Sequence, residues 1–79
     1  MNIRERVKKA AEGSLLDARE IEVLADMYNT LRDAARLGTQ NAEEEALKIG
    51  GVIWFLQGCG KIYDDEDLWM LMNEIEAEG

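Results

Sequence analysis

The residues of this sequence that are most able to act as nucleophiles or ligands are a single cysteine and a run of four consecutive acids. Cys59 lies in Gly58-Cys59-Gly60, and a reactive thiolate requires a nearby base or a helix N-terminus to lower its pKa. The chain contains no histidine, which excludes a cysteine–histidine pair. We therefore expect Cys59 to be an unreactive small residue in a tight loop, and we identify no catalytic residue.

The acidic run at 64–67 raises the question of a calcium site. An EF-hand loop places acids at alternating positions and then requires a glycine and a final glutamate. Here four acids are consecutive and Leu68-Trp69 follows. In a helix starting at Asp65 these carboxylates would point in different directions around the axis and would not converge on an ion. One cysteine and no histidine also leave no zinc-type ligand set. The sequence predicts capping and solubility for this run, with no metal and no cofactor.

Catalysis by other groups also finds little support. An enzyme needs positioned acids, bases or nucleophiles in a concave pocket, and paired carboxylates could supply acid–base chemistry in principle. Ligand pockets measure roughly 300–1,000 Å³, and we expect a chain of 79 residues to be too small to hold such a hollow beside a core. The sequence favours a protein that is not an enzyme.

The distribution of charge points to a partner. The chain has 17 acids and 9 bases, for a net charge of −8. Residues 1–13 carry four bases and two acids, whereas residues 63–79 carry seven acids and no base. A phosphate backbone would repel this chain, but a basic surface would attract it. We therefore expect no direct contact with nucleic acid, and a basic host protein or protein complex as the partner.

The first two helices that carry these charges are marked by caps and glycines. Residues 3–11 form one amphipathic helix, and Gly13 after it is a candidate left-handed stop. Asp17-Ala18-Arg19-Glu20 matches a capping box, with Leu16 and Ile21 at the positions of a hydrophobic staple. The second helix then extends to about Leu37 and ends at Gly38.

The last two helices follow the same pattern. Asn41-Ala42-Glu43-Glu44 predicts a cap with three glutamates in the first turn, at the positive end of the helix dipole. This helix ends near Gln57, before Gly58-Cys59-Gly60. Asp64 predicts the next cap, with Tyr63 and Leu68 as a staple, and a final helix that ends near Glu78.

The pair Gly50-Gly51 weakens the third predicted helix, because each glycine costs about 1 kcal/mol relative to alanine. A strand at 52–56 is the alternative, since these residues are mostly strand formers. A helix is favoured because an isolated strand would have no partner elsewhere in the chain. The two glycines then allow a neighbouring helix to approach closely, or they mark a kink.

The apolar faces predict how the helices pack. The second helix has two adjoining apolar stripes that span about 200°, twice what an ordinary surface helix needs, so we expect it to be central. In the last helix Leu68, Leu71, Met72 and Ile75 share a stripe, and Trp69 and Met70 lie off it on opposite flanks. In the third helix Ala46, Ile49, Ile53 and Leu56 share a face, and Phe55 points the other way.

These observations predict an all-α fold, a compact small helical bundle with three main helices and a short N-terminal helix, forming a single domain over residues 1–79. The N-terminus has no secretory signal, and the longest strongly apolar run, 52–56, is far short of the roughly 20 residues that cross a membrane. An unpaired thiol suits a reducing compartment. We expect a cytoplasmic protein without a membrane partner.

The predicted partner-binding surface combines the acids of the last helix with the apolar side chains that have no place in the core. A tryptophan among carboxylates is a plausible hot spot against an arginine-lined groove, so Trp69 is the expected anchor. The predicted contact residues are Asp64, Asp65, Glu66, Asp67, Trp69, Met70, Glu74, Glu76 and Phe55.

In size, charge and lack of catalytic residues, the chain resembles the small acidic proteins with which phages block host defences, anti-CRISPR proteins among them. Many of these are stoichiometric binders, and some present acids where DNA would lie, as DNA mimics. The resemblance includes no sequence motif and assigns no residue. It implies a protein-binding inhibitor or adaptor that docks on a basic, nucleic-acid-binding surface.

Two alternative functions remain. One is a homo-oligomer, such as a homodimer, that buries the wide apolar arc of the second helix or the segment 52–56. The other is an antitoxin-like neutraliser of a basic toxin.

Overall fold

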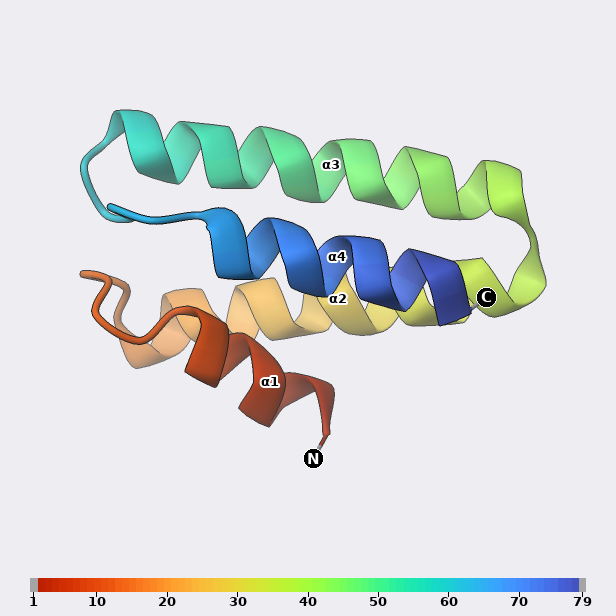
Figure 1. Ribbon diagram of the computed structural model, residues 1–79, viewed down its shortest axis with the longest axis horizontal. Helices are drawn as coiled ribbons and strands as arrows, with labels where there is room; N and C mark the ends of the chain where they lie inside the picture. Colours follow the sequence, from red (N-terminus) through yellow and green to blue (C-terminus); the bar gives the residue numbers. More distant parts are fainter. Residues whose placement is uncertain (1, 79) are drawn as a thin grey trace.

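The arrangement of the helices is given by a computed structural model, which describes residues 2–78. In this range the chain forms α1 (Ile3–Ala10), α2 (Ala18–Leu37), α3 (Thr39–Gly58) and α4 (Glu66–Glu78). The helix α2 packs against each of the other three, and α4 lies between α1 and α3 (Figure 1). The predicted all-α bundle of three main helices with a short N-terminal helix is confirmed, and so is the central place of the second helix.

The first two helices begin at the predicted residues, and α1 has in addition a cap at Asn2 that was not predicted. The Asn2 side chain accepts a hydrogen bond from the backbone N–H of Glu5 at 2.8 Å. The Glu20 N–H donates to Asp17 Oδ1 at 2.8 Å, and the Asp17 N–H donates to Glu20 Oε1 at 3.2 Å, which completes the capping box. The hydrogen bond from the Glu20 N–H lowers the pKa of the Asp17 carboxyl. Gly13, with a φ of 82°, takes the left-handed conformation predicted for it.

The junction between α2 and α3 differs from the prediction. Gly38 alone connects the two helices, with φ 158° and ψ 156°, and its carbonyl already accepts from the Ala42 N–H at 3.3 Å. The helix α3 therefore begins at Thr39, and no side chain caps it. The predicted cap at Asn41 is wrong, and the three glutamates lie in the second turn, because the chain reverses within one glycine.

The start of α4 follows the prediction in part. Asp64 Oδ1 accepts from the Glu66 N–H at 3.0 Å, so Asp64 does satisfy an N-terminal donor. Tyr63 is exposed, however, and Ile62 enters the core in its place. The expected staple fails because the helix starts at Glu66, two residues after Asp64, which moves Tyr63 away from the position that packs against the first turn.

The glycine pair lies within one continuous helix, so the strand alternative at 52–56 is wrong. A Cβ atom added to Gly50 would lie 3.0 Å from Cη2 of Trp69, whereas one added to Gly51 would meet no atom within 4 Å. Gly50 therefore permits the close approach of a neighbouring helix, as one of the two interpretations predicted. Gly51 has no such role within the chain.

The core lies where the three longer helices meet. The predicted inward stripe of α4 is buried, as are Ile49, Ile53 and Leu56 of α3. The hydroxyl of Tyr28, buried in α2, donates to the Leu68 carbonyl at 2.6 Å. The wide apolar arc of α2 is covered only in part, since Leu37, at the C-terminal end of the helix, is 80% exposed. Between residues 2 and 78, none of the helices has a stretch both long and apolar enough to cross a bilayer.

Candidate functional site

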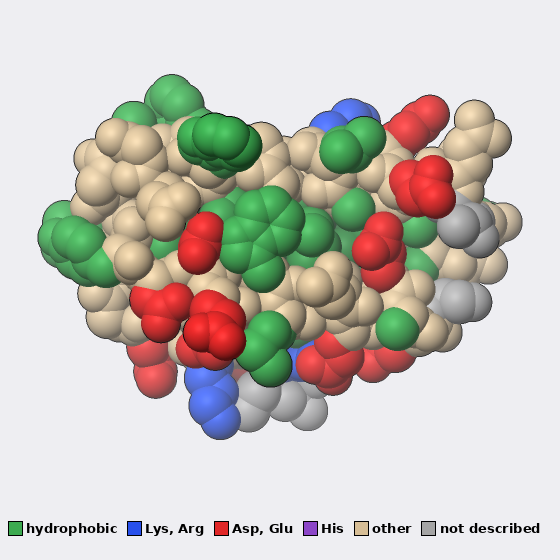
Figure 2. All heavy atoms as spheres, turned by 45° about the horizontal axis from the view of Figure 1, so that its top comes forward, with side chains coloured by type: hydrophobic (Ala, Val, Ile, Leu, Met, Phe, Trp, Pro, Cys, Tyr) green, Lys and Arg blue, Asp and Glu red, His purple; other side chains and the backbone are tan. Residues whose placement is uncertain are grey.

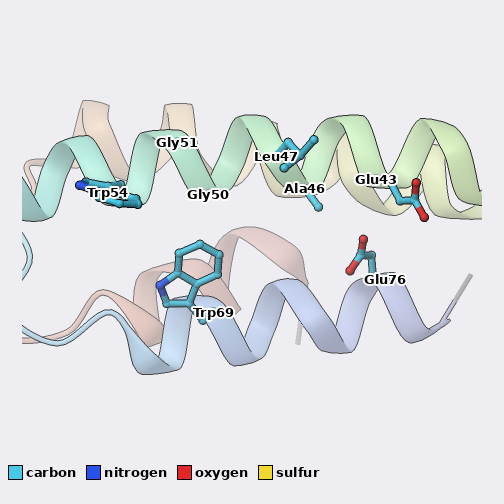
Figure 3. A pocket seen from close by; sticks show the side chains of 8 residues that line it. All are labelled: Glu43, Ala46, Leu47, Gly50, Gly51, Trp54, Trp69 and Glu76. Carbon is cyan, nitrogen blue, oxygen red and sulfur yellow. The ribbon is translucent and has the colours of Figure 1, made fainter.

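A hollow of about 570 Å³ runs along the surface between α3 and α4 (Figure 3). We call it the α3–α4 groove, and its lining is almost entirely apolar. It is lined by Glu43, Ala46, Leu47, Gly50, Gly51, Trp54, Trp69 and Glu76. Its size contradicts the expectation that a chain this small lacks such a hollow. The groove lies between two helices at the surface, so it does not compete with the core for volume.

One wall of the groove is the outward face of α3. Leu47, Gly51 and Trp54 are spaced by four and three residues, which places them on one side of a helix. Leu47 and Trp54 are each 77% exposed. Ile49 and Ile53, on the opposite side, are completely buried. The helix α3 therefore has an apolar face that the fold covers and a second apolar face that it leaves open.

The floor of the groove is the indole of Trp69, which rises from α4 toward α3 (Figure 3). The ring lies against Gly50, where the helix α3 has no side chain. Its Nε1–H donates to Asp65 Oδ2 at 2.8 Å, so the polar atom of the ring has a partner within the same helix. Trp69 is half-buried. It forms part of the surface of the groove, so a partner that contacts the indole must enter the groove.

The charged residues of the groove are acidic. Glu43 on α3 and Glu76 on α4 lie opposite each other at one end (Figure 3). No lysine or arginine is among the described residues that line it. On α3 itself, Lys48 pairs with Glu45 at 3.1 Å. In Figure 2, apolar side chains fill the middle of this face, with carboxylates on both sides of them.

The predicted contact residues do not form one patch. Trp69 and Glu76 line the α3–α4 groove, and Asp65 is attached to it through the Trp69 indole. Phe55 is 68% exposed on α3 but does not line the groove. Asp64 and Glu66 are exposed at the start of α4.

The remaining three predicted residues lie on the other flank of α4, facing α1. Asp67, Met70 and Glu74 line a separate hollow of about 340 Å³ together with Arg6 and Lys9 of α1. Arg6 Nη2 and Glu74 Oε1 form a salt bridge at 2.5 Å. The bases of α1 therefore balance part of the charge on this flank, whereas no base is among the described residues that line the α3–α4 groove.

The residues that could hold a metal or act as a nucleophile lie apart from the groove. Cys59 is exposed at the C-terminal end of α3. Within residues 2–78 no three side chains of cysteine, aspartate or glutamate converge on a common point where they could share an ion. The groove itself offers two carboxylates and a large apolar surface, which is an arrangement for binding an apolar and basic ligand.

Neither Trp54 nor Leu47 was identified as a site residue from the sequence, and Gly51 was noted only as one of a pair of glycines within a helix. Their spacing along one face of α3 was a usable signal, because this face lies opposite the predicted core face of Ile49 and Ile53. Glu43 was assigned to the first turn of the third helix, whereas it lies in the second turn, at one end of the groove.

The α3–α4 groove and the charge around it are thus the main candidate binding features of the described residues. Their geometry combines an open apolar surface with acids from two helices. No protein family model, curated protein or solved structure matches this chain.

Proposed function

We propose that this protein is a non-enzymatic binding module, an inhibitor or adaptor, that docks its acidic side, centred on α4, on a basic surface of a partner protein. The observation that supports this function is the uncompensated charge of the last helix. Residues 63–79 contain seven acids and no base. Among the described residues, Glu74 alone of these seven acids is in a salt bridge.

The physical basis is electrostatic attraction. Clustered carboxylates on one side of a small protein repel one another, and a basic partner relieves this repulsion when it binds. Such charges are screened over about 8–10 Å near physiological ionic strength, so binding is expected to weaken with added salt. The nucleic-acid-binding site of a host protein is a surface of this kind. The specific form of the proposal is phage counter-defence of the anti-CRISPR type, with the acids of α4 placed where nucleic acid would lie.

The test begins with capture of the partner from a host lysate at low salt and its release by a salt step. The purified partner is then measured against a variant with Glu66→Lys and Glu78→Lys. A control variant with Glu12→Lys and Asp26→Lys carries the same net charge but leaves α4 unchanged. We expect the α4 variant to associate roughly tenfold more slowly or worse, and the control to change little. Equal loss in both variants, or no loss in either, would contradict docking through α4.

A second candidate function is a homo-oligomer, favoured by the apolar side chains that α2 and α3 leave open. Val23, Leu37 and Phe55 are all largely exposed. Each chain carries a net charge of −8, so added salt would strengthen self-association by screening repulsion. Salt has the opposite effect on docking to a basic partner. Sedimentation over a dilution series at low and high salt therefore separates the two functions, and an antitoxin-like role differs from the first only in the partner.

A further inference from the structure

We infer that the α3–α4 groove binds the apolar face of a basic amphipathic helix supplied by the partner. This inference rests on the proposed function and names the part of the partner that is recognised. It is carried by three features of the groove: its apolar walls, a glycine that the fold itself does not require, and the sign of the surrounding charge.

The walls of the groove determine the kind of surface that fits. Leu47 and Trp54 stand at the rim, and Trp69 forms the floor. Leu47 and Trp54 are seven residues apart, which is two turns or roughly 10 Å along α3. An occupant that covers them needs apolar side chains one and two turns apart on a single face, which is the pattern of an amphipathic helix.

Gly51 is the second and independent feature. It lies inside α3 between Leu47 and Trp54, where glycine costs about 1 kcal/mol relative to alanine. A Cβ atom at this position would meet nothing within 4 Å, so no contact of the chain itself requires the absence of a side chain. A bare backbone at the rim of the groove lets a partner's side chain approach α3 closely, which accounts for the glycine.

Charge determines the class of occupant. Glu43 and Glu76 flank one end of the groove, and its described lining contains no base. An acidic peptide or a nucleic acid would be repelled, and so would a second copy of this chain, with its net charge of −8. A helix with lysine or arginine beside its apolar stripe satisfies both the walls and the carboxylates.

The probe for this inference is a synthetic helical peptide without tryptophan, built from leucine and lysine so that the leucines fall at i, i+3, i+4 and i+7. Both tryptophans of the chain, Trp54 and Trp69, line the groove, so protein fluorescence reports on its occupancy. We expect a saturable blue shift with one peptide bound per chain. A peptide of the same composition in scrambled order should require at least tenfold more, and a leucine–glutamate version should give no shift.

The matched variants are Gly51→Leu and Phe55→Ala. Gly51→Leu places a side chain in the groove, at a position where the chain itself leaves open space, and it leaves the charge unchanged. The new side chain occupies the place of the peptide, so binding should weaken at least tenfold. Phe55→Ala removes an exposed apolar side chain from the same helix outside the groove, so it should bind as wild type does. Circular dichroism establishes that both variants remain helical.

Several results would overturn the groove as the binding site. These are wild-type affinity in Gly51→Leu, equal binding of the scrambled peptide, or a self-association that Gly51→Leu abolishes. In the first two cases the acidic surface alone attracts the peptide, and docking through α4 stands without the groove. If Gly51→Leu abolishes peptide binding but salt does not weaken the binding of the wild type, the occupant is not basic and the proposed electrostatic function is wrong. If Gly51→Leu abolishes peptide binding and salt releases the peptide from the wild type, both the groove site and the proposed function are supported.

Discussion

Tyr28 is the residue that most directly attaches α4 to the central helix. Its ring is completely buried, and its hydroxyl donates to the Leu68 carbonyl at 2.6 Å. Burial raises the pKa of the Tyr28 hydroxyl far above its ordinary value of 10.0. The neutral phenol is therefore part of the folded state, and it also holds the helix that forms the floor of the groove.

Replacing Tyr28 with phenylalanine should lower the free energy of unfolding by about 1 kcal/mol, the usual contribution of a hydrogen bond. The raised pKa adds a pH dependence, because above pH 10 the unfolded chain loses this proton while the folded chain keeps it. The contribution of Tyr28 is complete below about pH 10 and declines as the pH rises further. Urea unfolding of both proteins at pH 7 and above pH 10 should show a smaller difference at the higher pH, and a constant difference would contradict this account.

The two tryptophans illustrate how far single residues could be predicted. Trp69 was identified from its place among carboxylates and off the core stripe, and it does lie at the groove. Its half-buried placement could not be predicted from the sequence, because it depends on Gly50, a residue on another helix. Trp54 was missed, although its position opposite Ile53 and Ile49 on α3 made its exposure predictable.

At the scale of the helices, caps and glycines in the sequence predicted most of the boundaries. The capping box of Asp17 and Glu20 is formed, and Gly13 has the predicted conformation. The prediction failed at Asn41, because the chain reverses at Gly38 and α3 begins at Thr39, which places Asn41 inside the first turn. Propensity describes each helix separately, whereas the length of the turn is determined by how α2 and α3 pack against each other.

The two adjacent glycines of α3 should respond in opposite ways to alanine. Gly51→Ala should raise the free energy of unfolding by about 1 kcal/mol, because alanine favours the helix and the added methyl meets open space. Gly50→Ala should gain less or lose stability, since its methyl would lie 3.0 Å from Cη2 of Trp69 and would displace the ring. Thermal or urea unfolding of the two variants measures the contrast. Equal stabilisation by both would show that the indole does not lie against Gly50.

At the scale of the whole molecule, the all-α class and the excess acidity followed from composition and periodicity. The order in which α1, α4 and α3 lie across α2 did not, because neighbouring contacts between helices are not encoded in the pattern of any one of them. This order determines that Arg6 reaches Glu74 on one flank of α4. It also determines that the flank facing α3 keeps its carboxylates beside an apolar groove.

The net charge of −8 should make the stability of the fold depend on salt. Sodium chloride screens the repulsion among the acids, so raising its concentration from low to physiological levels should increase the melting temperature. The expected rise is a few degrees, since about 0.5 kcal/mol corresponds to roughly 2–4 °C in a domain of this size. The variant with Glu66→Lys and Glu78→Lys should show a smaller rise, and an equal rise would indicate that repulsion within α4 is not the cause.

The contact between the edge of the Trp69 ring and a residue without a side chain has a consequence for selectivity. The edge of the ring, at Cη2 and Cζ3, points at Gly50, so the indole fills the space between α3 and α4 at this position. A smaller aromatic side chain at this position would let the two helices close and would narrow the channel between them. One side chain therefore sets the width of the α3–α4 groove and the size of the ligand that enters it. The acids that attract the ligand stay the same.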